Sequence, residues 1–167
     1  MKPIVFALPG NETFAQQLAT ALEADTGETT IRNFPDGETY VRVLTDVNGR
    51  EVILVCTLDH PDGKLLPLYF LSHTLKSLGA KCTCIVAPYL AYMRQDKVFH
   101  PGEGITSAYF AKLISGFAER LFTIDPHLHR RTSMAEIYSV PCMVLHASTL
   151  ISDYIRDHIG NPLLIGP

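Results

Sequence analysis

Apolar residues along this chain gather in short runs that alternate with segments of helical spacing. A continuous apolar run such as Val52–Val55 is typical of a central strand in a parallel sheet. Phe14, Leu18 and Leu22 instead recur at the spacing of one helix face. The pattern predicts strands over Ile4–Leu8, Thr29–Phe34, Tyr40–Val43, Glu51–Thr57, Lys81–Ala87, Glu119–Ile124, Val140–Leu145 and Pro162–Ile165.

The helices are predicted from their spacing and from the residues that begin and end them. Asn11 is expected to cap the first helix and Gly27 to end it. The later helices are expected over Lys64–Leu78, which Pro67 interrupts, Ile105–Phe117 and Thr149–Ile159. Strands that alternate with helices favour an α/β fold with a mostly parallel sheet and helices on both faces.

Composition narrows the class of protein. With 167 residues, 47% hydrophobic residues and 19% charged residues, the chain has the size and make-up of one globular domain. Its net charge is −3 and its strongest basic cluster is the pair Arg130–Arg131, so we expect no nucleic acid as a partner. No apolar run is long enough to cross a bilayer. The four cysteines fit small buried hydrophobic residues in a reducing compartment, which predicts a cytoplasmic protein.

The segment Pro88–Lys97 carries the strongest chemical signal. It follows a predicted central strand, and Arg94, Gln95 and Asp96 bring a cation, an amide and a carboxylate together at its end. Ligands of open α/β sheets bind outside the carboxyl ends of the strands. A guanidinium can grip phosphate or stack on a base, so this corner fits a polyphosphate with its metal. Residues 99–104 then read as a loop over the site.

Two further segments carry polar residues of possible function. In the turn Asn33–Glu38, Phe34 can stack on a base while the neighbouring carboxylates hold sugar hydroxyls, although Asp-Gly alone is common in plain turns. Asp125 and His127 follow another predicted strand and suit a divalent cation bound together with phosphate. A zinc site that uses His127 and His129 is the alternative, and it lacks a clear third and fourth ligand.

Several common motifs are missing from the sequence. It has no Gly-x-x-x-x-Gly-Lys-Ser/Thr loop, no Gly-x-Gly-x-x-Gly after the first strand and no Gly-x-Ser-x-Gly elbow. These absences argue against a P-loop kinase, a dinucleotide-binding protein and an α/β-hydrolase.

In combination, the three polar segments resemble the N-terminal domain of ribose-phosphate diphosphokinases, also called phosphoribosyl pyrophosphate synthetases. The matching motifs are Phe34–Glu38, Tyr92–Lys97 and Thr123–His127, in the family's order. The resemblance implies a phosphoribosyltransferase-like fold. It also implies transfer of the diphosphoryl group of Mg-ATP to ribose 5-phosphate, which yields phosphoribosyl pyrophosphate and AMP. Residues 98–103 and 128–133 depart from the bacterial pattern and indicate a divergent branch.

The resemblance also assigns roles to residues. Asp125 and His127 are implied to contact Mg²⁺, and the protein is implied to be a homo-oligomer, because a neighbouring subunit supplies the turn. The residues implied to bind ATP are Arg94, Gln95 and Asp96 from the strand end, and Phe34, Asp36, Gly37 and Glu38 from the turn.

The same resemblance predicts the domain organisation. Residues 1–160 are expected to form the N-terminal domain, and residues 161–167 to begin a second one. At Gly166-Pro167 the family usually has Ser-Pro-Asp, and the ribose-phosphate loop of its second domain is not in this chain. We therefore expect the chain alone to be inactive as a synthetase. The alternative function is a non-catalytic nucleotide-binding or regulatory subunit of the same fold.

Overall fold

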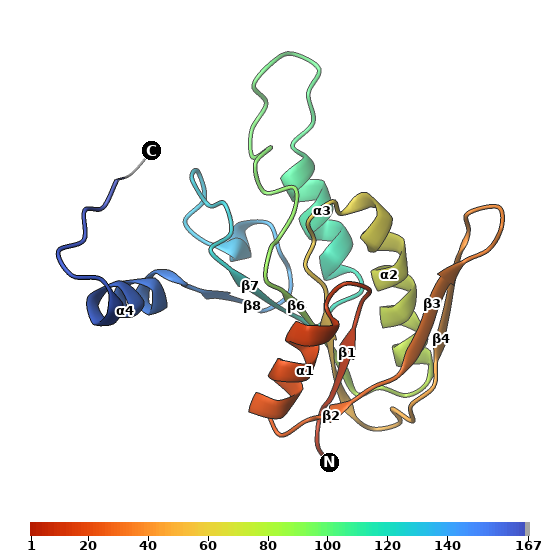
Figure 1. Ribbon diagram of the computed structural model, residues 1–167. Coiled ribbons are helices and arrows are strands. Elements are labelled where there is room, and N and C mark those ends of the chain that lie inside the picture. The colour runs from red at the N-terminus through yellow and green to blue at the C-terminus, as the bar shows by residue number, and fades with distance from the viewer. Residues whose placement is uncertain (166–167) are drawn as a thin grey trace.

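A computed structural model describes residues 1–165, in which a six-stranded parallel sheet stands beside a two-stranded antiparallel hairpin (Figure 1). The large sheet has the strand order β2-β1-β5-β6-β7-β8, and all of its neighbouring pairs are parallel. The sheet therefore confirms the predicted α/β class. Its strands are β1 (Ile4–Ala7), β2 (Asp25–Thr26), β5 (Glu51–Val55), β6 (Cys82–Ala87), β7 (Arg120–Ile124) and β8 (Cys142–Leu145).

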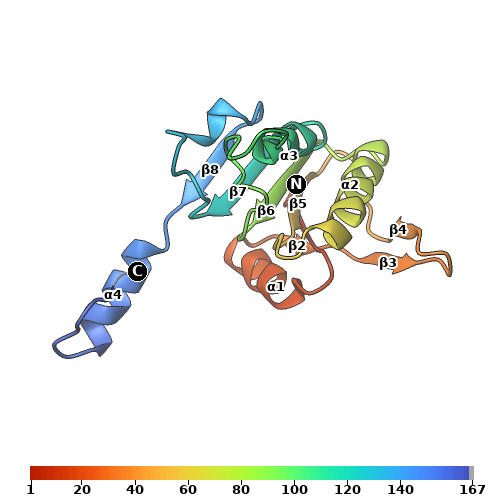
Figure 2. The same ribbon diagram turned by 90° about the horizontal axis from the view of Figure 1, so that it is seen from above.

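Helices cover both faces of this sheet, as the sequence predicts. Figure 2 shows α1 on one side of the strands and α3 on the other, and α2 packs with α3. The helices are α1 (Glu12–Ala21), α2 (Asp62–Ser77), α3 (Thr106–Ser115) and α4 (Ser148–His158), with the 3-10 helix η1 (Met134–Glu136) before β8.

Side chains of β1 point alternately to the two faces of the sheet, so this one strand contributes to two hydrophobic cores. Ile4 and Phe6 are fully buried in the larger core, which also contains the inward faces of α2 and α3. Val5 points to the opposite face and packs with Ala15 and Ala19 of α1. Successive side chains of a strand point to opposite faces of its sheet, so a continuous apolar run can fill both layers.

The start and the end of the first helix differ from the prediction. Asn11 precedes α1, but its side chain makes no capping bond. Instead its Oδ1 accepts from the Thr57 amide at 2.8 Å, which links the carboxyl ends of β1 and β5. The helix ends at Ala21, and the chain forms the unpredicted short strand β2 before it reaches Gly27. Gly27 serves close packing, because an added Cβ would lie 2.2 Å from the Phe6 ring.

The carboxyl-terminal part of the described chain stands apart from the sheet. The helix α4 projects away from β8 and contains no buried residue (Figures 1 and 2). The predicted strand Pro162–Ile165 is wrong, since these residues have no regular structure. Leu163, for example, is 84% exposed, and no strand of the described part of the chain pairs with this segment. The predicted departure at Gly166-Pro167 lies outside the described residues.

The predicted turn at residues 34–38 joins β3 (Thr29–Asn33) to β4 (Thr39–Val43). The Phe34 amide donates to the Glu38 carbonyl at 2.8 Å, and the Glu38 amide donates to the Asp36 carboxylate at 3.1 Å. Gly37 has a φ of +91°, which glycine adopts without steric cost. This hairpin lies beside α2 rather than in the large sheet (Figure 1).

Two further expectations from the sequence concern the cysteines and the absence of membrane-spanning segments. All four cysteines are free, and burial raises the pKa of the Cys56 thiol to about 12. Cys82 and Cys84 share one face of β6, as the alternation predicts, and both are half-buried. Among the described helices, none is both long and apolar enough to cross a membrane.

Candidate functional site

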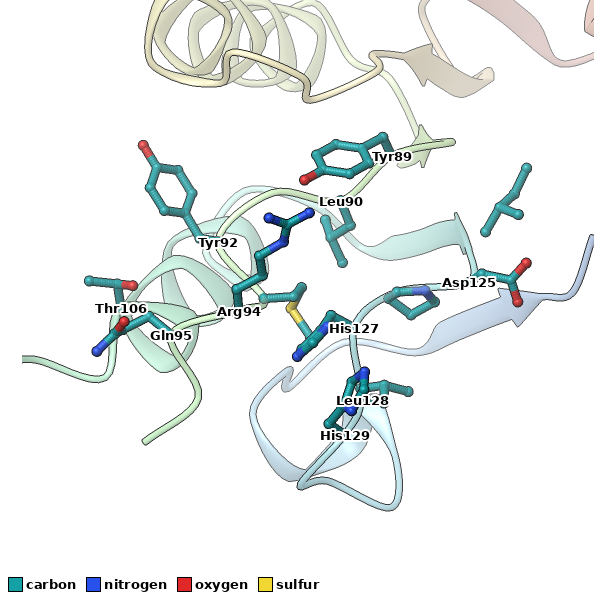
Figure 3. A pocket seen from close by; sticks show the side chains of 13 residues that line it. Tyr89, Leu90, Tyr92, Arg94, Gln95, Thr106, Asp125, His127, Leu128 and His129 are labelled. Carbon is teal, nitrogen blue, oxygen red and sulfur yellow. The ribbon is translucent and has the colours of Figure 1, made fainter. Parts of the chain in front are cut away.

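A pocket of about 780 Å³ lies at the carboxyl ends of β6 and β7. Two loops form it: residues 88–105, which connect β6 to α3, and residues 125–133, which connect β7 to η1. Arg94 and Gln95 come from the first loop and His127 from the second, and all three surround one space (Figure 3). Parallel strands end at the same edge, so the sheet brings together segments some thirty residues apart in the sequence.

Anchors just before Arg94 fix the course of the first loop. Leu90 and Met93 enter the main core and are at most 5% exposed. Tyr92 has a φ of +58°, its ring lies against Phe110, and its hydroxyl bonds to the Asp62 carboxylate. This bond raises the pKa of the Tyr92 hydroxyl. The loop can therefore present Arg94 to the pocket while its neighbours stay in the core.

Gln95 is held by a second network within the same loop. Its Nε2 donates to the Glu103 carboxylate at 3.1 Å. The same carboxylate oxygen accepts from the amides of Phe99 and His100 at 2.7 and 2.9 Å. These amides, before the bond from Gln95, lower the pKa of Glu103, so Glu103 is ionised at neutral pH and closes the loop of residues 97–104 on itself.

Asp96 lies next to the pocket residues but faces elsewhere. Its side chain is only 1% exposed, and both of its carboxylate oxygens accept from Nη1 of Arg130, at 2.9 and 3.2 Å. The polar groups predicted at this strand end thus divide into two sets. Arg94 and Gln95 line the pocket, while Asp96 joins the two loops that form its walls.

His127 and His129 line the opposite wall of the pocket. Their rings stack, with centroids 4.0 Å apart. Partial burial, and then the nearby His129, lower the pKa of His127. The imidazole of His127 is therefore neutral at physiological pH and can contact a water molecule or a metal ion through an unprotonated nitrogen.

Asp125 lies at the edge of the pocket, and its carboxylate points away from His127 (Figure 3). It accepts from the Ala147 amide at 3.0 Å and lies 2.8 Å from Nδ1 of His146. The Ala147 amide first, and then His146, lower the pKa of Asp125. The predicted partners Asp125 and His127 are thus neighbours in sequence whose polar groups face different parts of the structure.

The donor set of the pocket indicates which kind of metal it fits. Within residues 1–165, no three His, Cys, Asp or Glu side chains are placed to hold an ion together. Zinc needs four ligands, so the paired His127 and His129 give the zinc alternative little support. Magnesium prefers oxygen ligands and keeps several waters when it is bound with phosphates. Among the described residues, the pocket therefore offers no complete ligand set for a resident ion.

The predicted residues of the hairpin turn do not join this pocket within one chain. The structure places the turn at the free end of the β3–β4 hairpin, and α2 lies between it and the pocket (Figures 1 and 2). Arg32 packs over the rings of Phe34 and Tyr40, at 4.9 and 4.4 Å from their centroids. The turn residues Phe34, Asp36, Gly37 and Glu38 are all exposed.

Three residues of the site were not among those predicted. Tyr89 and Thr106 line the pocket, and Arg130 holds Asp96. Tyr89 lies within the polar segment already recognised, and Thr106 is the first residue of α3, at the end of a helix that favours anions. Arg130 belongs to the one basic pair that the sequence shows, but nothing near it in the sequence indicates its partner.

These features define an α/β protein with a polar ligand site at the carboxyl edge of a parallel sheet. The model of a family described as the N-terminal domain of ribose phosphate pyrophosphokinase matches residues 3–117. The chain belongs to this family.

Relatives with known names agree with this assignment. A ribose-phosphate pyrophosphokinase from Saccharolobus solfataricus is 34% identical over 136 residues, which are 80% of this chain and 46% of that protein. One from Methanobrevibacter smithii is 32% identical over 159 residues, or 94% of this chain and 52% of that protein. The chain thus spans about half the length of these relatives.

A solved structure supports the fold. The crystal structure of phosphoribosylpyrophosphate synthetase from Mycobacterium smegmatis superposes with a TM-score of 0.84 at 26% identity. The superposition covers 94% of this chain and 53% of that one. The predicted resemblance and the predicted phosphoribosyltransferase-like α/β fold are confirmed.

Proposed function

We propose that this chain provides the Mg-ATP site of a ribose-phosphate diphosphokinase. In this reaction the anomeric hydroxyl of ribose 5-phosphate attacks the β-phosphorus of ATP, the diphosphoryl group is transferred, and AMP leaves. The observation that carries the proposal is that Arg94, Gln95 and His127 line one pocket at the carboxyl ends of two adjacent strands. The named relatives support the same reaction.

The charges of the pocket suit a triphosphate. Arg94 is exposed in the pocket, and its guanidinium can bind phosphate oxygens or stack on the base. Asp96 adds no free negative charge, because Arg130 bonds to both of its oxygens. The protein's task in such a transfer is mainly to place the phosphates and to stabilise their charge.

Magnesium enters the proposal as part of the substrate complex. When bound with ATP, the ion neutralises charge on the phosphates. His127 would contact the ion or its water shell with a neutral imidazole. Asp125 is the second residue proposed for this ion, and it would have to exchange its present bonds to Ala147 and His146 to reach it.

A second copy of the chain completes the proposed site. The exposed turn with Phe34, Asp36, Gly37 and Glu38 lies away from the pocket of its own chain, yet Phe34 is 40% exposed and free to pack on a planar base. We propose that the turn of one subunit closes over the pocket of another, which makes a homo-oligomer the functional form. A cytoplasmic location stays a prediction.

Replacing Arg94 tests the nucleotide site directly. We expect Arg94→Ala to weaken Mg-ATP binding by about 1–3 kcal/mol, because a charge-assisted contact is lost. Titration calorimetry on the chain, with Mg-GTP as the comparison nucleotide, measures the affinity. Arg156→Gln is the matched control, since Arg156 lies on α4 and pairs there with Asp153. Equal Mg-ATP affinity in the Arg94 variant and the wild type would contradict the proposal.

The alternative function, a non-catalytic nucleotide-binding or regulatory subunit, predicts the same Mg-ATP affinity. Formation of phosphoribosyl pyrophosphate distinguishes the two. A longer form of the protein that makes this product supports the enzyme, whereas one that binds Mg-ATP without making it supports the regulatory subunit.

A further inference from the structure

The side chain of Asp96 is almost completely hidden, although the residues that follow it directly in the loop are exposed. Its side chain is 1% exposed, while Lys97, Val98 and Phe99 after it are all exposed. A buried carboxylate needs a partner, because an unpaired charge away from water is costly. Arg130 is that partner, and its Nη1 lies 2.9 and 3.2 Å from the two carboxylate oxygens.

The neighbouring Arg131 strengthens the same connection. Its Nη2 donates to the Ser107 hydroxyl at 2.9 Å and to the Asp96 carbonyl at 3.4 Å. The Ser107 hydroxyl in turn donates to the Gln95 carbonyl at 2.8 Å. Two consecutive arginines from the loop after β7 therefore hold Asp96 in the loop after β6, Arg130 by its carboxylate and Arg131 by its carbonyl.

Arg130 also contacts the far part of the first loop. Its guanidinium carbon lies 5.4 Å from the centroid of the Phe99 ring, and Lys97 packs on the same ring at 4.9 Å. A cation over an aromatic face is attracted to it. The Arg130 side chain thus contacts two places in this loop, the carboxylate of Asp96 and the exposed ring of Phe99.

We infer that Asp96 and Arg130 are positioning residues for nucleotide binding, a role that rests on the proposed Mg-ATP site. Arg94 lies two residues before Asp96, and His127 lies three residues before Arg130. The ion pair joins the two loops that carry them, so the pocket is ordered before the nucleotide arrives and binding costs less conformational entropy. It also neutralises a carboxylate that would otherwise repel the triphosphate. Asp96 thereby acts through Arg130 rather than by contacting ATP.

Affinity measurements test this role. We expect Arg130→Gln to weaken Mg-ATP binding about tenfold, as loss of one charged hydrogen-bonded pair implies. Arg130→Lys keeps a cation near Asp96 and is expected to restore part of the affinity. The double variant Asp96→Asn/Arg130→Gln is expected to bind no more weakly than Arg130→Gln alone, since both changes remove one ion pair. Additive losses, or no rescue by lysine, would overturn the inference.

A second measurement needs no nucleotide. Trypsin cleaves after Lys97, which lies in the loop that Arg130 holds. We expect Arg130→Gln to raise the rate of cleavage after Lys97 several-fold at constant global stability, while the control Arg156→Gln leaves it unchanged. An unchanged cleavage rate in Arg130→Gln overturns the inference by itself. Another pair of results separates the two proposals. If the wild-type chain binds no Mg-ATP but Arg130→Gln is still cleaved faster, the proposed function fails and the connection between the loops stands.

Discussion

Single side chains in this protein are directed by partners far away in the sequence. Asp125 shows this clearly. It follows β7 directly, has a φ of +40°, and bonds to His146 and Ala147, just before α4, instead of turning toward His127. Its carboxylate therefore links the end of one strand to the residues that follow the next.

The lowered pKa of Asp125 predicts a pH dependence of stability. The folded pKa of this carboxylate lies below its unfolded value of about 3.9. Ionised Asp125 therefore stabilises the fold above pH ~3.9, and this contribution is lost as the pH falls through the folded pKa. The urea midpoint of the wild type is therefore expected to fall more between about pH 5 and 3 than that of Asp125→Asn. Asparagine suits this variant, because it tolerates a positive φ. Asp36→Asn, in the exposed hairpin turn, is the control; equal slopes for Asp125→Asn and the wild type would contradict the prediction.

Between helices α2 and α3, a buried hydrogen bond fixes how the two elements meet. Ser72 of α2 is fully buried, and its hydroxyl donates to the carbonyl of Phe117, just after α3, at 2.7 Å. Phe117 itself is buried and packs against Tyr69 of α2. This bond holds the two helices of one face in register over the sheet.

We expect Ser72→Ala to lower the free energy of unfolding by about 1–3 kcal/mol, because it leaves the buried Phe117 carbonyl without its donor. Ser77→Ala on the same helix is the control, since the Ser77 hydroxyl bonds only to the His73 carbonyl of its own helix at an exposed position. Urea unfolding of both variants measures the difference. Equal stability of the two variants would show that the bond between the helices contributes nothing.

The positions of the proposed nucleotide-binding residues in the molecule decide how many chains one such site needs. Arg94 and His127 share a pocket, whereas Phe34 and its turn lie beyond α2 at the end of the hairpin (Figure 1). No rearrangement of side chains alone brings the turn to the pocket of its own chain. The proposed site shared between copies is the arrangement that would use both.

Mixing two defective variants tests this arrangement. In an oligomer of Arg94→Ala and Phe34→Ala chains, some pockets combine an intact Arg94 with an intact turn from the neighbour. We therefore expect the mixture to bind Mg-ATP more tightly than either variant alone, and its affinity to rise with protein concentration. A mixture that binds no better than the average of the two variants would refute the shared site. Mixing each variant with Arg156→Gln controls for simple dilution.

From the amino-acid sequence alone we could predict the alternation of strands and helices, the turn around Gly37, and the placing of Arg94 and His127 after strands. These features depend on periodicity and turn chemistry within a few neighbouring residues. It also carried the family resemblance, because the three motifs are contiguous stretches of sequence.

The partners of the polar groups became clear only from the fold. Asp96 binds Arg130, 34 residues away, and Asp125 binds His146, 21 residues away. The fold likewise determines that Pro162–Ile165 forms no strand, since a strand needs a neighbour with free backbone groups and none of the strands described in residues 1–165 pairs with this segment. Local propensity acts along the chain, whereas pairing and burial depend on what folding brings near.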